Sequence, residues 1–350
     1  MSFLTRERNF ILMLGLTFIA AGAFYDQPHI AMWIGFAIAG YSAIANDSIQ
    51  TLGTFIASNK KTPWWMMWLF VGGIFVLTVS YSWYFRNGDV SHGRLMSKGF
   101  ATAPTEFAFL QVAAPIFLLI LTRLRMPVST TFLLLSCFAT EAKGFWAVTT
   151  KSLNGYLIAF VSAIAVWMIA GPTLKRIFKG EASLGWIIAQ WISAGFLWSV
   201  WLMQDAANIA VYLPRSLSTG EFLGFAGTIF LGLGFLLRMG GEKVQEVVNE
   251  KSDVSDVRSA TVINIIYGII LYLFKVKSQV PMSTTWVFVG LLAGREIAMA
   301  IRQAGGEERT LKMALSMAGK DLLYVTIGFI VAVIIAATTN EVVREALFNG

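Results

Sequence analysis

Long apolar stretches separated by short polar loops run along almost the whole chain. A helix needs about 20 apolar residues to cross a membrane. We expect membrane segments near 9–25, 30–58, 63–84, 102–122, 127–148, 152–171, 183–213, 219–237, 257–274, 281–300 and 320–338. The segments 30–58 and 183–213 are too long for one straight span. The pattern predicts an all-α polytopic membrane protein with about 11 apolar segments, and it leaves open whether 102–122 and 127–148 span fully or form a re-entrant hairpin.

Each of the two longest segments contains an acidic motif about halfway along. Residues 45–54 read ANDSIQTLGT and include Asp47, and residues 203–214 read MQDAANIAVYLP and include Asp205. A carboxylate is expensive in lipid, so an aspartate at that depth indicates function. The alternative is a structural role, in which Asn and Asp side chains join neighbouring helices through hydrogen bonds.

A second motif, proline followed closely by Ser-Thr-Thr, also occurs twice. MPVSTT occupies 126–131 and VPMSTT occupies 280–285. The stretch of chain from Asp47 to Ser129 is nearly as long as the stretch from Asp205 to Ser283. Two motifs that recur in the same order at nearly the same spacing indicate an internal duplication.

The distribution of Lys and Arg in the loops predicts the orientation of the two copies. Basic residues before the first segment, after the second and between the halves favour a cytoplasmic N-terminus and an outward C-terminus. The segments 30–58 and 183–213 then run in opposite directions. We therefore predict two inverted repeats, 1–180 with an extra N-terminal helix and 181–350, as in many secondary transporters.

The two motifs together suit an anion. Proline followed by Ser-Thr-Thr predicts a helix start, and the free N–H groups of such a start attract negative charge. Hydroxyls of Ser129, Thr130, Ser283 and Thr284 would add donors. The carboxylates can accept the proton of a protonated oxyanion such as hydrogen phosphate, or they can help to bind Na⁺.

Composition excludes several other classes. The chain of 350 residues is 56% hydrophobic and 13% charged, with a mean hydropathy of +0.66. Its net charge of +7 fits cytoplasmic anchors, and we expect no nucleic-acid partner. Its single cysteine, Cys137, forms no disulfide within the chain, and His29 and His92 predict no transition-metal site. The sequence has no ATP-binding glycine-rich loop, and we do not expect an enzyme.

The paired motifs resemble those of the inorganic phosphate transporter family, the cation-coupled phosphate permeases. Each half of that family carries approximately Gly-x-Asn-Asp-x-x-Asn-Ala followed by Pro-x-Ser-Thr-Thr-His, and the likeness covers nearly the whole chain. Three features depart from it. Gln50 and Gln204 each replace one Asn, Phe132 and Trp286 replace the His, and 63–84 and 219–237 lack the internal Glu of many members.

The resemblance implies two sets of site residues. Substrate would be held by Asn46, Asp47, Ser129, Thr130, Asp205, Asn208, Ser283 and Thr284. The cation or its coupling would involve Gln50, Thr54, Thr131, Gln204 and Thr285.

The function implied by the resemblance is symport of inorganic phosphate with Na⁺, or H⁺, by alternating access in the plasma (inner) membrane, with a homodimer possible. Na⁺ is the expected coupling ion and no other cofactor is implied. The departures leave three alternatives: a proton-coupled permease for sulfate or another oxyanion, an anion channel, and a membrane sensor that no longer transports.

Overall fold

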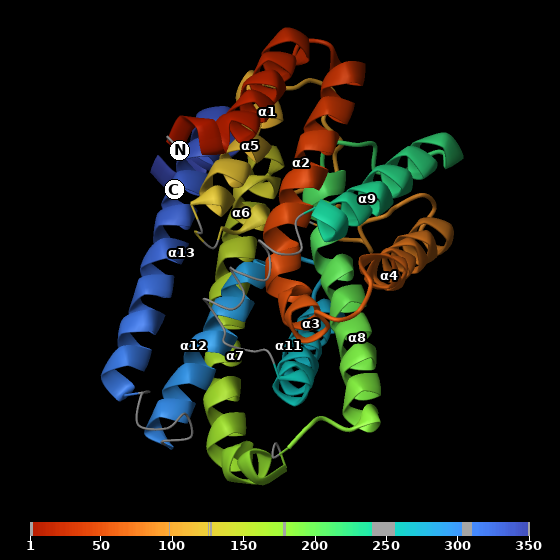
Figure 1. The fold of residues 1–350 in the computed structure, drawn as a ribbon. Helices are drawn as coiled ribbons and strands as arrows, with labels where there is room; N and C mark the ends of the chain where they lie inside the picture. Colours follow the sequence, from red (N-terminus) through yellow and green to blue (C-terminus); the bar gives the residue numbers. More distant parts are fainter. Residues whose placement is uncertain are drawn as a thin grey trace.

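A computed structural model describes residues 3–97, 99–124, 126, 128–177, 180–239, 256–302 and 310–348. These residues form helices joined by loops (Figure 1). The helices are α1 (Phe3–Phe24), α2 (Pro28–Thr51), α3 (Gly53–Ser58), α4 (Trp64–Phe85), α5 (Phe109–Arg123), α6 (Thr130–Leu133), the 3₁₀ helix η1 (Leu135–Phe138), α7 (Ala142–Ile177), α8 (Leu184–Ala210), α9 (Thr219–Met239), α11 (Val257–Lys277), α12 (Thr284–Ile301), α13 (Leu311–Thr339) and α14 (Glu341–Phe348).

Eight helices in the described part are long and apolar enough to cross a membrane. Their outward faces carry large apolar side chains, such as Leu77 on α4 and Ile169 on α7, which are 72% and 80% exposed. In water such surface would be unfavourable, whereas lipid tails solvate it. The structure confirms the prediction of an all-α polytopic membrane protein.

The segments 102–122 and 127–148 do not form two full spans. Helix α5 is only 15 res long. At about 1.5 Å per residue it covers roughly 22 Å, which is short for a membrane crossing. The chain then turns back through α6 and η1, and the Gln111 side chain near the start of α5 donates to the carbonyl of Cys137 at 2.9 Å. The two pieces therefore form a re-entrant hairpin, and residues from Ala142 onward belong to the long helix α7.

The two long segments behave differently from each other. The segment 30–58 is broken at Leu52, where α2 ends and α3 begins. The segment 183–213 contains one continuous helix, α8, from Leu184 to Ala210. At about 1.5 Å per residue α8 is roughly 40 Å long, enough to cross the membrane at a tilt without a break.

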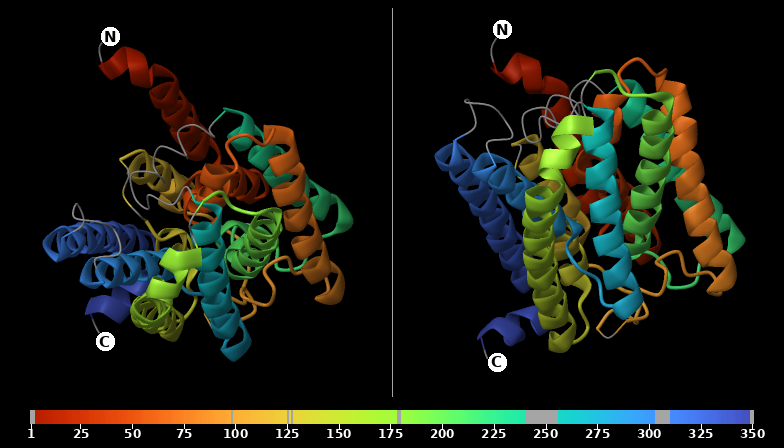
Figure 2. Two further views of the ribbon diagram at one scale, coloured as in Figure 1. Left: turned by 60° about the horizontal axis from the view of Figure 1, so that its bottom comes forward. Right: turned by 90° about the horizontal axis from the view of Figure 1, so that it is seen from below.

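Helices from the two parts of the chain pack in matching pairs. Helix α2 packs on α5 as α8 packs on α11, and α4 packs on α8 as α9 packs on α2. Helix α7 packs along α12, and α13 contacts α6. Figure 2 shows the N- and C-terminal ends of the described chain at opposite ends of the helix bundle. The boundary predicted at 180/181 falls in the connection between α7 and α8.

Close contact between α7 and α12 depends on small residues. Gly290 and Gly294 lie one helical turn apart on α12, the spacing that lets two membrane helices approach closely. A Cβ on Gly290 would lie 2.5 Å from the carbonyl oxygen of Tyr156, and one on Gly294 would meet the carbonyl of Phe160. This packing fixes the position at which α12 begins.

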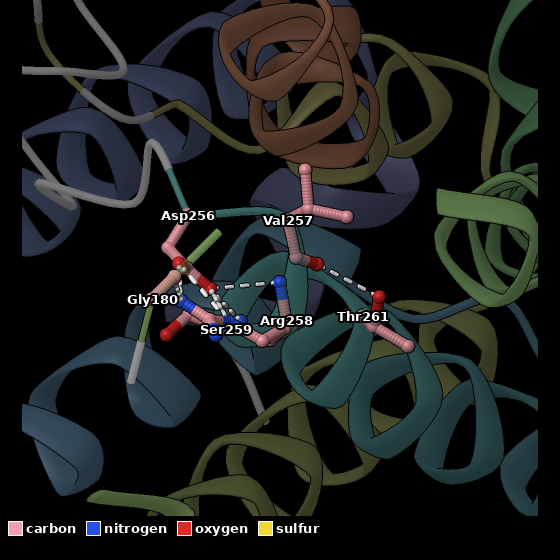
Figure 3. A network of polar contacts seen from close by, with 6 residues as sticks. All are labelled: Gly180, Asp256, Val257, Arg258, Ser259 and Thr261. Atoms are coloured by element: carbon pink, nitrogen blue, oxygen red, sulfur yellow. Dashed lines mark hydrogen bonds and ion pairs between the residues drawn. The ribbon is translucent and has the colours of Figure 1, made fainter. Parts of the chain in front are cut away.

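The start of α11 is held by the polar network of Figure 3. Asp256 is the N-cap and accepts from the amides of Arg258 and Ser259 at 2.8 and 3.2 Å. The Arg258 guanidinium pairs with the same carboxylate at 2.7 Å and donates to the carbonyl of Gly180 at 3.0 Å. The cap thus ties α11 to the connection between α7 and α8.

Candidate functional site

Asp47 and Asp205 both lie in the interior of the molecule. They are 0% and 1% exposed. Helix α2 ends at Thr51 and α8 at Ala210, so each aspartate lies in the last two turns of its helix rather than halfway along an apolar span, which corrects the expectation from the sequence.

The two Ser-Thr-Thr triplets begin helices, as their sequence predicts. Ser129 caps α6, accepting from the amide of Phe132 at 3.2 Å, and Ser283 caps α12, accepting from Trp286 at 3.3 Å. Helix α6 is a single turn, whereas α12 continues to Ile301. The free N–H groups and positive dipole end of a full helix therefore come from α12.

The triplets also bond to each other in a crossed arrangement. The Thr131 hydroxyl donates to the carbonyl of Met282, the residue before the second triplet, at 3.1 Å. The Thr285 hydroxyl donates to the carbonyl of Val128, the residue before the first triplet, at 3.1 Å. Each triplet therefore holds, through a threonine hydroxyl, the backbone carbonyl directly before the other triplet. The side chains that follow the triplets meet as well, with the ring centroids of Phe132 and Trp286 5.4 Å apart.

Asp47 is joined to the first triplet. Its Oδ1 accepts from the Asn46 side-chain amide at 2.7 Å, and the same amide donates to the carbonyl of Val128 at 3.0 Å. The Thr122 hydroxyl donates to Asn46 Oδ1 at 3.1 Å, and Thr130 lies near the Asp47 carboxylate. The end of α2 and the tip of the α5–α6 hairpin thus form one polar group.

Asp205 is joined to both triplets. Its Oδ1 accepts from the Asn208 amide at 2.6 Å, and that amide also lies 3.0 Å from Thr130 Oγ1 and 3.2 Å from Thr131 Oγ1. Thr131 Oγ1 itself lies 3.4 Å from Asp205 Oδ1, and Thr284 lies near the carboxylate. The aspartates lie close enough for their charges to repel each other.

All eight residues expected to hold substrate are brought together at this centre. Each is buried, with at most 5% of its surface exposed. Thr131 and Thr285, expected for the cation, lie in the same centre through the crossed bonds described above. This gathering joins four parts of the chain far apart in the sequence.

The other three residues expected for the cation are placed differently. Gln204 is buried, and its amide donates to the carbonyl of Leu271 on α11 at 3.0 Å. Thr54 lies on α3 and donates to Asn264 Oδ1 at 3.0 Å, so its side chain bonds toward α11 rather than toward either aspartate. The side chain of Gln50 lies outside the described part of the structure.

Several buried acceptor atoms at the centre have no partner within the described residues. They are the second carboxylate oxygens of Asp47 and Asp205 and the amide oxygen of Asn208. Buried polar atoms are normally hydrogen-bonded, so a set of unpaired atoms requires an explanation. These three atoms are oxygens that accept, which suits a cation or the O–H of a ligand.

Sequence reasoning missed three residues that contact or border the centre, Thr122, Tyr267 and Arg94, and a fourth, Asn264, that bonds to Thr54. Tyr267 donates its hydroxyl to the carbonyl of Thr284 at 2.9 Å, and Asn264 has a buried amide nitrogen without a partner among the described residues. Arg94 is fully buried and donates to the carbonyl of Met203 at 3.3 Å. No local pattern in the sequence marks these residues, because only the packing of their helices and loops brings them here.

Arg94 contributes positive charge to the site from a loop. Burial lowers the pKa of Arg94 to about 9, and the charge of Asp205 works in the opposite direction. The side chain is therefore mostly protonated at neutral pH. It partly balances the two carboxylates of the centre.

The fold and its polar centre define a multi-pass, all-α membrane protein with the architecture of a transporter. A solved structure, "The sodium-dependent phosphate transporter", matches it with a TM-score of 0.59 over 94% of this chain and 98% of that chain, at 16% sequence identity. No family model and no curated protein matches the sequence. The likeness establishes a shared fold with that structure.

Proposed function

We propose that the protein is a secondary transporter that moves inorganic phosphate together with Na⁺ across the plasma (inner) membrane. The observation that carries the proposal is the meeting of both Asp motifs and both Ser-Thr-Thr triplets in one buried centre. A transporter needs such a centre near the membrane midplane, formed by elements that can move relative to each other. The shared fold with a sodium-dependent phosphate transporter supports the same function.

The anion would be held at the start of α12. Its first N–H groups and the hydroxyls of Ser129, Thr130, Ser283 and Thr284 supply donors for oxyanion oxygens. The unpaired oxygens of Asp47 and Asp205 are acceptors. Hydrogen phosphate carries an O–H that a carboxylate can accept, whereas sulfate has none at neutral pH. The mixture of donors and acceptors therefore favours phosphate.

The cation would be held by the unpaired oxygens. Two carboxylates that repel each other need positive charge between them, and the neutral amide oxygen of Asn208 is nearby. Amide oxygens are good ligands for Na⁺ but poor acceptors of a proton. The oxygen set therefore favours Na⁺ over H⁺ as the coupling ion.

The matching helix pairs support an inverted-repeat mechanism. Helices α2 and α5 would correspond to α8 and α11, while α7 packs on α12 of the other half and α13 packs on α6 of the other half. Rocking of the two halves would expose the centre to one side of the membrane at a time. The buried state of the site residues corresponds to a conformation closed to both sides.

Uptake of radiolabelled phosphate into proteoliposomes tests the proposal, with and without an inward Na⁺ gradient and with excess sulfate as competitor. We expect accumulation that requires Na⁺ and resists sulfate. Uptake abolished by sulfate, or supported only by a proton gradient, would instead assign the proton-coupled oxyanion permease. Flux without accumulation would indicate a channel. Absence of phosphate and sulfate flux in any gradient would indicate a sensor.

The aspartates provide the matched variants for this assay. Asp47→Asn and Asp205→Asn should each lower Na⁺-driven uptake by roughly 100-fold, as expected for loss of a buried charged partner worth about 3 kcal/mol. Asp26→Asn is the control, because Asp26 is exposed between α1 and α2. Normal uptake by either variant would remove that carboxylate from the mechanism, provided that the protein elutes as a folded species.

A further inference from the structure

Three buried basic side chains converge beside the second triplet, and one of them, Arg94, also lies next to the centre described above. Arg94 comes from the loop between α4 and α5, Lys151 from α7 and Lys275 from the end of α11. They are 0%, 9% and 8% exposed. Side chains of this kind are rarely buried unless they are paired.

Arg94 and Lys151 hold the same two backbone oxygens. Arg94 Nη1 donates to the carbonyls of Ser278 and Val280 at 2.6 and 3.0 Å. Lys151 Nζ donates to Ser278 at 3.1 Å and also to Val280. Two donors that share an oxygen at these distances lie at most about 6 Å apart, so their positive charges repel.

Lys275 adds a third charge to the same region. Its ammonium donates to the carbonyl of His92 at 2.8 Å and to the side chain of Gln279 at 2.6 Å. It lies close enough to Arg94 for the two to repel, and Arg86 acts on both. The cluster therefore gathers three basic groups in a buried place, where a bound anion would favour their charged forms.

No carboxylate in the described part of the chain forms an ion pair with these three cations. Asp205 attracts Arg94 but forms no hydrogen bond with it. Asp89 attracts Lys275, but its carboxylate oxygens already accept from the amides of Ser91 and Gly93 at 2.7 and 2.6 Å. Buried charges without a paired counter-charge are strongly unfavourable. An anion from solution or lipid would remove this cost.

The cluster also has donors left over. Arg94 Nη2 is buried and has no partner among the described residues. Each lysine ammonium has three N–H groups and uses two of them in the contacts above. The free donors therefore come from a planar guanidinium fork and two ammonium groups, a combination that matches a tetrahedral oxyanion.

We propose that Arg94, Lys151 and Lys275 form a second anion site, for a phosphate-type oxyanion, beside the central site. Arg94 bonds to Met203, close to Asp205, and it also bonds to Ser278 and Val280, just before the start of α12. The cluster thus lies next to the start of α12. The orientation predicted from the basic residues of the loops places the cluster on the outer side. There it would collect the anion before the centre receives it, a role that rests on the proposed function.

Binding can be measured without transport. Radiolabelled phosphate is titrated into the Asp47→Asn/Asp205→Asn double variant in phosphatidylcholine nanodiscs. We expect one saturable site that remains in the double variant, because neither aspartate contributes to it. Adding Lys151→Met should weaken this binding at least tenfold, and Lys151→Arg should restore it. Lys277→Met is the control, because Lys277 is exposed near Lys275 at the end of the same helix.

Two results would overturn the site. One is absence of phosphate binding to the double variant. The other is binding that neither Lys151→Met nor Arg94→Gln changes. A further arm replaces part of the phosphatidylcholine with phosphatidylglycerol. If phosphate binding is unchanged in the presence of phosphatidylglycerol, the ligand of the site is the free ion. If phosphatidylglycerol competes and phosphate binding is lost, the ligand is the phosphate group of a lipid.

Uptake kinetics test the role in transport. Lys151→Met should raise KM for phosphate about tenfold while kcat changes less than about twofold, because the central site is intact. If Lys151 only stabilised the backbone before α12, Lys151→Met would lower kcat as well. If the unaltered protein took up no phosphate, the proposed function would fail, yet the nanodisc titration would still decide whether the anion site exists.

Discussion

At the scale of single residues, the centre depends on hydroxyls that satisfy carbonyls of the opposite triplet. Thr131 and Thr285 are 1% exposed, and each donates to a carbonyl directly before the other triplet. In the membrane interior no water can replace such a donor. A carbonyl that loses its donor stays buried without a hydrogen bond, which lowers the stability of the fold. The threonines therefore have a structural role as well as their proposed role toward a cation.

Replacing one of these hydroxyls tests this role. Thr285→Val keeps the shape of the side chain and leaves the Val128 carbonyl with one donor fewer, which should lower stability by about 1–3 kcal/mol. The measurement is the thermal midpoint of the purified protein in detergent. Thr285→Ser should recover most of the loss. Thr338→Val is the control, since Thr338 is exposed and bonds to Ile334 of its own helix; equal losses in both variants would contradict the crossed arrangement.

At the scale of elements, the position of α12 is set by its contact with α7. Gly290 and Gly294 leave no room for a side chain, so the two backbones touch and the start of α12 is fixed against α7. Small residues are the usual means of such contact in membranes, because lipid supplies little hydrophobic force between helices. The geometry of the anion site therefore depends on glycines further along the same helix.

Gly290→Ala should separate the helices. The added methyl group would lie 2.5 Å from the Tyr156 carbonyl oxygen, which is rigid backbone. We therefore expect a loss of about 1–3 kcal/mol and reduced uptake. Gly319→Ala on α13 meets nothing within 4 Å and should be neutral or slightly stabilising. Thermal midpoints of the two variants check this. A stable, active Gly290→Ala protein would show that α12 is free to shift.

The cap of α11 gives a prediction that depends on pH. Partial burial tends to raise the pKa of Asp256, but hydrogen bonds from Arg258 and Ser259 outweigh it and hold the pKa below its ordinary value. A depressed carboxyl pKa stabilises the fold at neutral pH. This contribution disappears as pH falls through the pKa of the folded state.

Asp256→Ala should therefore destabilise the protein by about 1 kcal/mol at pH 7, the usual value of an N-cap. Its thermal midpoint should approach that of the unaltered protein as pH falls through the depressed pKa of Asp256 in the folded state, since the unaltered carboxylate is then protonated. Glu341→Ala is the control, because that side chain is 74% exposed in its pair with Arg344. A difference that persists at low pH would show that the cap acts through packing and not through charge.

At the scale of the whole molecule, alternating access as proposed requires that the two halves have opposite orientations in the membrane. The end of α3 and the start of α9 lie on opposite sides of the membrane in the proposed topology. Ser58, the last residue of α3, is partly buried and bonds to the carbonyl of Thr54 within that helix. Lys60 follows it in the loop and is exposed, so it is the better position to label.

Single cysteines at Lys60→Cys and Ser218→Cys, in a Cys137→Ala background, test the topology. A membrane-impermeant thiol reagent added to intact cells should label Ser218→Cys and should reach Lys60→Cys only after the cells are opened. Labelling of both positions from the same side would exclude the inverted repeat. The native Cys137 is buried, so a weak background is expected even without its removal.

The sequence by itself determined the fold class of this protein and which residues meet in its interior. Continuous apolar segments can be stable only as membrane helices, because each helix satisfies its own backbone, so composition and periodicity were sufficient to predict the all-α membrane fold. The duplicated motifs with Asp47, Asp205, Ser129 and Ser283 identified the central residues in advance, since charged groups in apolar segments have few structural explanations.

Only the tertiary structure decided where those segments turn and what surrounds the motifs. An apolar run looks alike whether it crosses the membrane or turns back within it, so the α5–α6 hairpin and the break at Leu52 could not be read from hydropathy. Thr54 illustrates the same limit, since its side chain bonds to Asn264 and not to the aspartates. Arg94 lies in a loop without any motif, and its place beside Asp205 arises from long-range packing, which a local sequence pattern does not encode.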